Sequence, residues 1–369
     1  MNASQASEGT AMPAPPVAAG TGAAGRALAG SARLAVPSAV VMTALLFAGS
    51  ALFVPGVLAT DSLLSMAPFA ALLAVTAIGQ MLVVQQGGLD LSVAGVISMS
   101  AVIVTKYPDG ADSRLAPALL LVALLALAVG LVHGYLVTVV GVTPLVATLG
   151  GNALLLGGVQ HFTNGSPGAV PAGLQRFALA KTFGVPNTVL IALSVAVIVA
   201  LVLHRTVLGR RFQAVGANPA AARAAAVSLI RYGTGTYVCA ALCHAAAGVL
   251  LAGFIRTPAL NIGDSYLLAG IAAVVVGGTA LAGGRGTVLG TVLGALFLTQ
   301  LNQIVLSLGA GTAVQYLIQG LIIALGVILY RVRRRSATAR AGRAGRAGRG
   351  GRRGEQAVQG PMTPRRADR

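Results

Sequence analysis

The sequence predicts an all-α fold, a polytopic membrane bundle of about ten transmembrane helices. Two observations carry this prediction. Hydrophobic residues make up 56% of the 369-residue chain and charged residues only 9%, whereas a soluble globular protein carries about 25% charged residues. The chain also contains repeated apolar runs of about 20 residues, the length that crosses a bilayer as a helix. Because lipid offers the backbone no hydrogen-bond partner, such runs are expected to be helical.

The apolar runs, taken in order along the chain, place the expected spans. They lie at 36–58, 63–84, 91–106, 117–140, 144–160, 186–204, 232–255, 265–282, 287–307 and 312–331. The runs at 91–106 and 144–160 are short and contain Gly and Ser, so either is a candidate for a broken or partly inserted helix. The expected count is ten spans, with eight or nine left open.

The two ends of the chain differ from these spans in composition. Residues 1–35 are rich in Ala, Gly, Ser and Pro without periodicity, which predicts a disordered leader before the transmembrane domain at 36–331. Residues 332–369 form an Arg- and Gly-rich tail, also predicted to be disordered. The tail contains no aromatic side chain on which a base could stack, so nucleic-acid binding is not expected. It is expected either to attract anionic lipid headgroups or to remain solvated and enforce the topology.

The distribution of basic residues predicts the orientation, because Lys and Arg near a span resist translocation. With ten spans and the N-terminus in the cytoplasm, 21 Lys and Arg fall on the inner side and 5 on the outer side. Of the inner ones, 13 lie in residues 331–369. Both termini are therefore expected in the cytoplasm.

The spans contain almost no charged side chain of the kind that couples a carrier to an ion gradient. The chain also has no phosphate-binding P-loop, since neither Lys106 nor Lys181 follows a glycine. Its four His are scattered over different spans and ends, so neither a metal site nor a membrane-embedded enzyme is expected. The chain is therefore either a passive channel or one part of a larger machine. The neutral polar candidates for a solute path are Gln80, Asn152, Asn302 and Gln303, and hydrogen bonding between helices is the alternative role for each.

The inner segment at 205–231 has the pattern of a short docking helix. Asn218 can cap a helix whose first residue is Pro219, where the missing N–H costs nothing, and the alanines that follow favour helix. Arg211 and Arg223 would then face water, headgroups or an acidic partner. Simple anchoring of the topology by these cations is the alternative.

Two further inner loops carry paired glycines. Gly87 and Gly88 precede Asp90 and Ser92, and Asp90 is expected to act as the N-cap or first-turn acid of the next helix. The stretch 283–290, which begins with Gly283 and Gly284, is a weak repeat of this pattern. A purely structural role is the alternative for both loops.

Four ordered motifs carry a family resemblance. They are GGLDLSVAGV (87–96), TPLVATLGG (143–151), LGRRFQAVGANPAAAR (208–223) and IAAVVVGGTALAGGRGTVLGTVLGAL (271–296). With them, the region 36–331 resembles the permease subunits of bacterial ABC importers for monosaccharides of the ribose, xylose and galactose type, in the branched-chain amino acid and sugar permease superfamily.

The resemblance implies an alternating-access permease of the bacterial cytoplasmic membrane that carries out no catalysis of its own. It implies three protein partners: a second permease copy, a cytoplasmic tandem ATPase that binds ATP and Mg, and an extracytoplasmic sugar-binding protein. No cofactor is expected on this chain. The residues expected to couple it to the ATPase are Gly209, Arg211, Gly216, Asn218, Pro219 and Arg223.

One position departs from the family pattern. Where the family commonly has Tyr-Glu-Leu-Asp, this chain has Tyr266, Leu267, Leu268 and Ala269, so both acids are absent. This affects the expected solute, the contact with the binding protein, or both. Permeases for nucleosides or branched-chain amino acids therefore remain alternatives to a sugar permease, as does a passive facilitator.

Overall fold

The computed structural model describes residues 35–54 and 56–328. The expected tail and nearly all of the expected leader lie outside these residues. The helices of the described part, in chain order, are α2 Ala35–Phe53, α3 Thr60–Gln85, α4 Val93–Lys106, α5 Leu115–Tyr135, α6 Pro144–Thr163, α7 Ala172–Leu179, α8 Asn187–Arg205, α9 Val207–Ala217, α10 Pro219–Ala224, α11 Leu229–Ile255, α12 Asp264–Val276, α13 Val288–Ser307 and a last helix, Thr312–Ile328. A 3-10 turn, Asp112–Arg114, precedes α5, and a π-helical turn, Leu136–Val140, follows it. Two short strands, β1 Lys181–Thr182 and β2 Val185–Pro186, form a hairpin.

The polytopic helical bundle that the sequence predicts is confirmed. Each of the ten expected spans contains a helix. Five helical spans are long and apolar enough to cross a bilayer: Thr60–Gln85, Asp112–Val140, Asn187–Arg205, Leu229–Ile255 and Val288–Ser307. Four shorter apolar helices accompany them: Ser38–Phe53, Val93–Lys106, Asp264–Val276 and Thr312–Ile328. The remaining span is α6, which has 20 residues but includes Asn152, Gln160 and His161.

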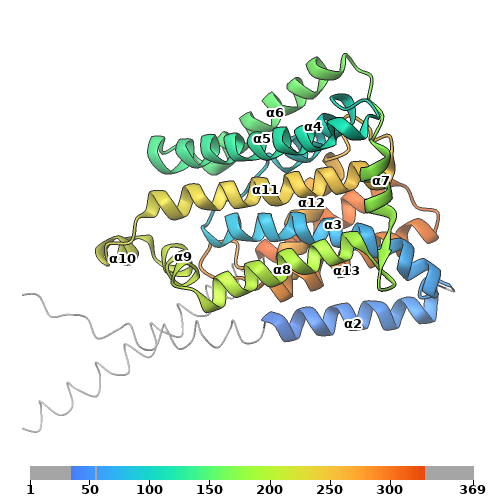
Figure 1. Ribbon diagram of the computed structural model, residues 1–369. Coiled ribbons are helices and arrows are strands. Elements are labelled where there is room, and N and C mark those ends of the chain that lie inside the picture. The colour runs from blue at the N-terminus through green and yellow to red at the C-terminus, as the bar shows by residue number, and fades with distance from the viewer. Residues whose placement is uncertain (1–34, 55, 329–369) are drawn as a thin grey trace, which may run out of the picture. The chain divides into compact units, whose positions relative to one another are not determined.

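Two helices, α3 and α11, form the centre of the bundle. In α3, 89% of the most apolar stretch is buried, against 22% in the span Asp112–Val140. Helix α11 packs against α3, α4 and α5, while α3 packs against α8, α12 and α13 (Figure 1). Leu72, Ile78 and Met81 of α3 are fully buried in this core. The exposed apolar faces of α5 and α8 are therefore among the surfaces that this chain can offer to lipid.

Two connections are longer than the sequence predicts, because two helices are shorter. We call residues 86–92 the α3–α4 break and residues 277–287 the α12–α13 break. Helix α4 has 14 residues and α12 has 13, about 20 Å each at 1.5 Å per residue, which is less than the roughly 30 Å of a bilayer core. Neither helix is therefore long enough to cross the bilayer core by itself. The expected span at 265–282 is wrong beyond Val276, because glycines follow and Gly278 takes a positive φ of 77°.

Small residues allow the helices next to the α12–α13 break to touch. A Cβ atom on Gly294 would collide with the carbonyl oxygen of Ala273, and one on Gly290 would collide with that of Gly277. Only glycine fits such backbone contacts, which are typical of helix packing in lipid. Helices α12 and α13 are thus held as a close pair on either side of the break.

The short elements gather at opposite ends of the bundle. Helices α9 and α10 lie at one end, where they form the connection between α8 and α11 (Figure 1). Helix α7 and the β1–β2 hairpin lie at the other end. The bundle therefore carries short elements beyond its long helices at both ends.

Candidate functional site

The segment at residues 206–224, which we call the α9–α10 segment, is built from two capped helices. Thr206 caps α9, its hydroxyl accepting a 3.1 Å hydrogen bond from the backbone N–H of Gly209. The Asn218 side chain caps α10, accepting a 3.0 Å bond from the N–H of Ala221, and Pro219 opens that helix. The predicted cap and start of this helix are confirmed. The sequence did not reveal that a separate helix, α9, precedes it.

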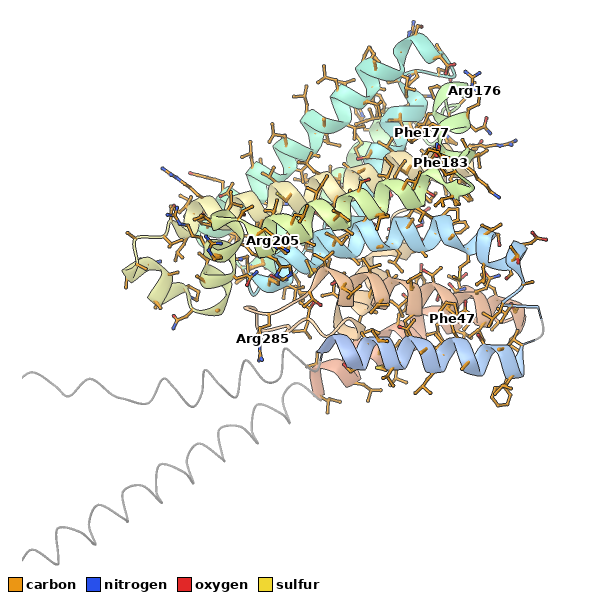
Figure 2. The ribbon with its side chains drawn as sticks, turned by 60° about the horizontal axis from the view of Figure 1, so that its bottom comes forward. Phe47, Arg176, Phe177, Phe183, Arg205 and Arg285 are labelled. Atoms are coloured by element: carbon orange, nitrogen blue, oxygen red, sulfur yellow. The ribbon has the colours of Figure 1, made fainter. Side chains whose placement is uncertain are left out.

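One face of the α9–α10 segment packs on the bundle and the other is open. Phe212, Val215 and Ala222 are buried. Gly209 is pressed against the backbone of Val202 and Leu203 at the end of α8, where a Cβ atom would collide. The three arginines of the segment are exposed: Arg210, Arg211 and Arg223. Arg205 and Arg285 lie at the same end of the molecule (Figure 2). The segment therefore packs on the bundle through apolar side chains and presents a basic surface to its surroundings.

The α9–α10 segment also contacts both breaks. The Gln86 side-chain nitrogen donates a 3.0 Å bond to the carbonyl oxygen of Phe212. Gly216 sits so close to the carbonyl oxygen of Gln85 that a Cβ atom would collide with it. That same oxygen accepts a 2.7 Å bond from the N–H of Gly284. Glycines from two separate motifs, Gly216 and Gly284, thus meet around one backbone carbonyl.

Positive backbone angles explain three of the four paired glycines. Gly283 and Gly284 have φ values of 87° and 78°, which favour glycine. Gly87 likewise has a φ of 81°. Gly88 instead needs its small size, because a Cβ atom would lie 2.9 Å from the Tyr237 hydroxyl. The motif glycines therefore shape the breaks and permit the close contact between them.

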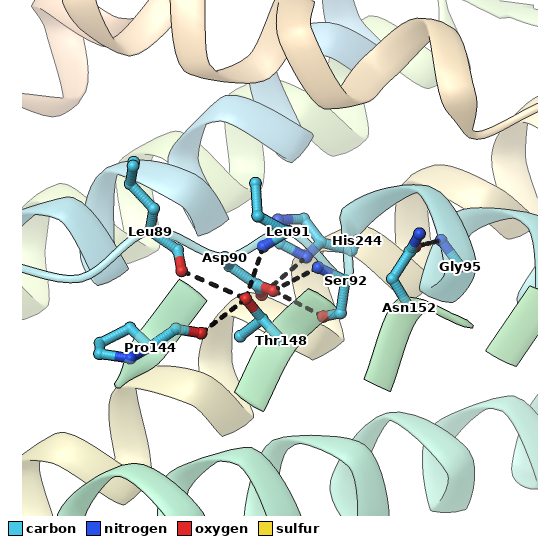
Figure 3. Close-up of polar contacts among 9 residues, drawn as sticks. All are labelled: Leu89, Asp90, Leu91, Ser92, Gly95, Pro144, Thr148, Asn152 and His244. Atoms are coloured by element: carbon cyan, nitrogen blue, oxygen red, sulfur yellow. Dashed lines mark hydrogen bonds and ion pairs between the residues drawn. The ribbon is translucent and has the colours of Figure 1, made fainter. Parts of the chain in front are cut away.

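A buried polar cluster lies further along the α3–α4 break (Figure 3). Asp90 is 1% exposed. Its Oδ1 accepts bonds from the backbone N–H and the hydroxyl of Ser92, at 2.8 and 2.6 Å. Its Oδ2 lies 3.6 Å from Nδ1 of His244 on α11, which is fully buried. The expectation that Asp90 caps α4 is wrong, because the helix starts at Val93 with Ser92 in the cap position and no side-chain capping bond.

Helix α6 is tied to this break by two side chains one turn apart. The Thr148 hydroxyl accepts a 2.9 Å bond from the N–H of Leu91. The Asn152 oxygen accepts a 2.7 Å bond from the N–H of Gly95 in the first turn of α4. On the other side, the Gln80 amide lies against the backbone of Asp90, and the amide orientation that satisfies both of its polar atoms donates to the Asp90 oxygen at 3.1 Å and accepts from its N–H at 3.3 Å. Polar backbone groups of this break thus find hydrogen-bond partners in the protein. Non-helical backbone inside a bilayer needs such partners, because lipid offers none.

The structure does not bring the four predicted path residues together. Gln303 donates a 3.4 Å bond to the hydroxyl of Ser62. Ser62 precedes Gln80 by 18 residues on α3, which is about 27 Å along a helix. Gln80 and Asn152 flank the α3–α4 break, whereas Asn302 and Gln303 lie on α13. Gln80, Asn152 and Gln303 all bond to other parts of the bundle, which is the role that the sequence left as the alternative.

Several residues of the site were missed from the sequence. Gln85 and Gln86 stand directly before the paired glycines, and Thr148 lies inside the second motif, so proximity to motifs was an available signal. His244 gave no such signal, because it stands alone in an apolar run. Among the described residues, no group of three or more His, Cys, Asp or Glu is placed to hold a metal ion.

The positions where the family commonly has acids are packed with apolar side chains. Ala269 on α12 is 4% exposed and lies in the core beside α3. Leu267 packs against a buried cluster that includes Leu72 and Ile97. Carboxylates at these positions would face apolar neighbours, so their absence leaves this part of the bundle uncharged.

Comparison with known proteins agrees with this architecture. Residues 62–327 match the family described as the branched-chain amino acid transport system, permease component. The chain belongs to this family of transport permeases. It is 34% identical over 307 residues to a probable ABC transporter permease protein of Sinorhizobium fredii, covering 81% of this chain and 89% of that protein.

Further relatives are named for the solute that they import. The ribose import permease protein of Bacillus subtilis is 32% identical over 259 residues, covering 69% of this chain and 80% of the relative. The galactose/methyl galactoside import permease protein of Haemophilus influenzae is 30% identical over 261 residues, covering 66% and 78%. No solved structure matches the chain. As a family member with long apolar helices, the chain is a multi-pass membrane transport component rather than an enzyme.

Proposed function

We propose that this permease forms the translocation path of an ATP-driven importer and that its solute is a monosaccharide of the ribose or xylose type. The α9–α10 segment supports the assignment to an ATP-driven importer. It presents exposed arginines, and its buried face contacts both breaks. The ribose and galactose permeases among the relatives support the choice of solute. The uncharged surroundings of Leu267 and Ala269 also suit a neutral solute better than a zwitterion.

The proposed mechanism is alternating access driven from the α9–α10 segment. A cytoplasmic ATPase binds ATP and Mg and closes on itself, which moves the segment that docks into it. The Gln86 to Phe212 bond and the Gly216 to Gln85 contact pass this movement to the α3–α4 break. Because helices α3, α4 and α6 meet at this break, a shift there can reorient them together. This chain supplies positioning and coupling, and ATP hydrolysis belongs to its partner.

The proposed assembly contains two permease copies, the ATPase and an extracytoplasmic sugar-binding protein. It lies in the bacterial cytoplasmic membrane with both termini of the permease in the cytoplasm. In this orientation the α9–α10 segment faces the cytoplasm, and α7 with the hairpin faces outward. The proposed functional residues of the segment are Gly209, Arg211, Gly216, Asn218, Pro219 and Arg223.

A transport assay in proteoliposomes tests the proposal. The full chain is reconstituted with its co-purified ATPase and supplied with a candidate extracytoplasmic sugar-binding protein. Accumulation of labelled ribose, xylose and galactose is compared with that of leucine and adenosine, with and without enclosed ATP. ATP-dependent accumulation of one of the sugars is the expected result. Preferential uptake of leucine or adenosine would overturn the sugar assignment, and uptake by the permease alone without ATP would make the chain a passive facilitator.

A further inference from the structure

The hairpin at the end opposite the α9–α10 segment holds a phenylalanine out of the protein. Strands β1 and β2 pair with Lys181 opposite Pro186 and Thr182 opposite Val185. Phe183 and Gly184 form the two-residue turn, with positive φ values of 54° and 77°. A bulky residue rarely adopts this left-handed conformation, and Asn or Gly is the usual choice. Phe183 does so with its side chain 98% exposed.

Hydrogen bonds fix this hairpin to the start of α8. The Thr182 hydroxyl donates a 2.7 Å bond to the side-chain oxygen of Asn187, the first residue of that helix. The Asn187 side-chain nitrogen donates a 3.0 Å bond to the carbonyl oxygen of Phe177, and its backbone N–H donates one of 3.0 Å to Ala180. Hydrogen bonds through Asn187 therefore hold the hairpin between the start of α8 and the end of α7. They fix the position of Phe183.

Phe183 belongs to an exposed apolar group. Phe177 and Leu179 at the end of α7 are 44% and 43% exposed, and Val185 is 36% exposed. The opposite face of α7 is buried, with Leu174 packed in the core beside α11. Figure 2 shows Phe177 and Phe183 near one another at this end of the molecule. Leaving such a group in water costs about 25 cal/mol for each Å² of apolar surface, so a covering environment is favoured.

The position of the hairpin identifies what covers this group. Phe183 stands four residues before α8, a span of which 28% of the most apolar stretch is buried. The exposed side chains of α8 include Leu193, Val197 and Ile198. Because this exposed surface meets lipid, the beginning of α8 lies at the boundary between hydrocarbon and water. Aromatic and basic side chains are enriched at this boundary.

Basic side chains accompany the apolar group. Lys181 is exposed beside the tip. Arg176 is also exposed and lies 3.5 Å from Asp112, which connects α7 to the turn before α5. Such cations suit the phosphate level of a bilayer, directly above buried aromatic rings.

We propose that the segment at residues 177–185, the interfacial hairpin, inserts the Phe183 ring into the boundary between lipid headgroups and acyl chains, with Lys181 at the phosphates. The partner is the phospholipid surface itself, which fixes the outer end of α8 at a set depth. The proposal requires only that the chain spans a membrane. It does not depend on the solute or on the ATPase.

The absence of tryptophan from the sequence gives this proposal a direct test. Phe183→Trp creates a single tryptophan, excited selectively over the tyrosines, in the full chain. The variant is reconstituted into phosphatidylcholine and phosphatidylglycerol nanodiscs. We expect a blue-shifted emission, weak quenching by aqueous iodide and a several-fold loss of intensity in acyl-brominated lipid. Phe177→Trp is a second reporter with the same expected behaviour. The control is Ala225→Trp, an exposed position after α10 that we expect to emit as in water.

Two results would overturn the proposal. In the first, the Phe183→Trp protein emits like the Ala225→Trp control and is insensitive to brominated lipid. In the second, the fluorophore is shielded from iodide without quenching by brominated lipid, or becomes shielded only when an extracytoplasmic protein is added. That outcome would assign the hairpin to a protein partner. Because the Phe183 side chain is almost fully exposed, its replacement is expected to leave the fold intact.

Discussion

The side chain of Gln86 donates a 3.0 Å hydrogen bond to the backbone carbonyl oxygen of Phe212. This bond joins the α3–α4 break to the buried face of the α9–α10 segment across 126 positions of sequence. The neighbouring contact of Gly216 with the carbonyl oxygen of Gln85 reinforces it. Movement of the segment therefore has a direct route into the bundle, and the following predictions test that route and its surroundings.

Replacing Gln86 with Leu is expected to weaken coupling rather than assembly. The change removes the bond to Phe212, worth about 1 kcal/mol, but leaves the exposed arginines in place. We expect the same yield of permease with bound ATPase and a several-fold lower ratio of solute transported to ATP hydrolysed. Gln175→Leu, at a half-exposed glutamine on α7, is the matched control. An unchanged ratio in the Gln86 variant would rule out this route.

Replacing Gly216 with Ala is expected to destabilise the protein by about 1 to 3 kcal/mol, the usual cost of overpacking. The added methyl group would collide with the carbonyl oxygen of Gln85. Gly157→Ala on α6 is the control, because nothing lies within 4 Å of a Cβ atom there. Alanine favours helix, so that variant is expected to be at least as stable as the parent. Thermal unfolding in detergent measures both, and equal midpoints for the two variants would contradict the packing argument.

The buried pair of Asp90 and His244 is expected to show energetic coupling. Their side chains approach to 3.6 Å from the α3–α4 break and from α11. We expect the free energies of unfolding for Asp90→Asn and His244→Ala to combine non-additively in the double variant, with an interaction of about 1 kcal/mol or more. Denaturant titration of the four proteins completes the cycle. Strict additivity would mean that the two groups lie close without interacting.

Replacing Thr148 with Val is expected to loosen α6 from the break. The variant keeps the side-chain shape but leaves the N–H of Leu91 without the hydroxyl that accepts its 2.9 Å bond, at a cost of about 1 to 3 kcal/mol. Faster hydrogen exchange at the break is the expected measurement. Ser194→Ala on α8 is the control, since that exposed hydroxyl bonds only within its own helix at 2.8 Å. Equal exchange at the break in both variants would contradict this role.

Features set by neighbouring residues could be predicted from the sequence, and features set by long-range packing could not. The apolar runs located the helices, and Asn218 with Pro219 predicted a capped helix, because a cap depends on residues three positions away. The span at 265–282 was overextended, because hydropathy does not register that Gly277 and Gly278 end the helix. In lipid such a break is stable only where other protein covers it, and here Gly284 bonds to Gln85.

The candidate site shows the same limit. Its motif glycines were identified in advance, but the carbonyl oxygen of Gln85 around which they meet belongs to a residue that no pattern singled out. Asp90 was expected to cap the helix that follows it. Its pairing with His244 could not be foreseen, because His244 lies 154 residues later in an apolar run. The four polar residues predicted for one path do not lie together, since spacing along a sequence does not report position along a helix in the bundle.

The most direct test of the account is co-purification of the tagged full chain with its ATPase from gently solubilised membranes. We expect a stable complex that is lost on Arg211→Glu, because the exposed arginine lies on the proposed docking surface. Arg114→Glu, an exposed arginine at the opposite end of the bundle, is expected to leave the complex intact. A complex that survives Arg211→Glu as well as it survives Arg114→Glu would contradict docking through the α9–α10 segment. If no ATPase co-purifies in several mild detergents and the chain alone conducts sugar into liposomes, the importer assignment itself is wrong.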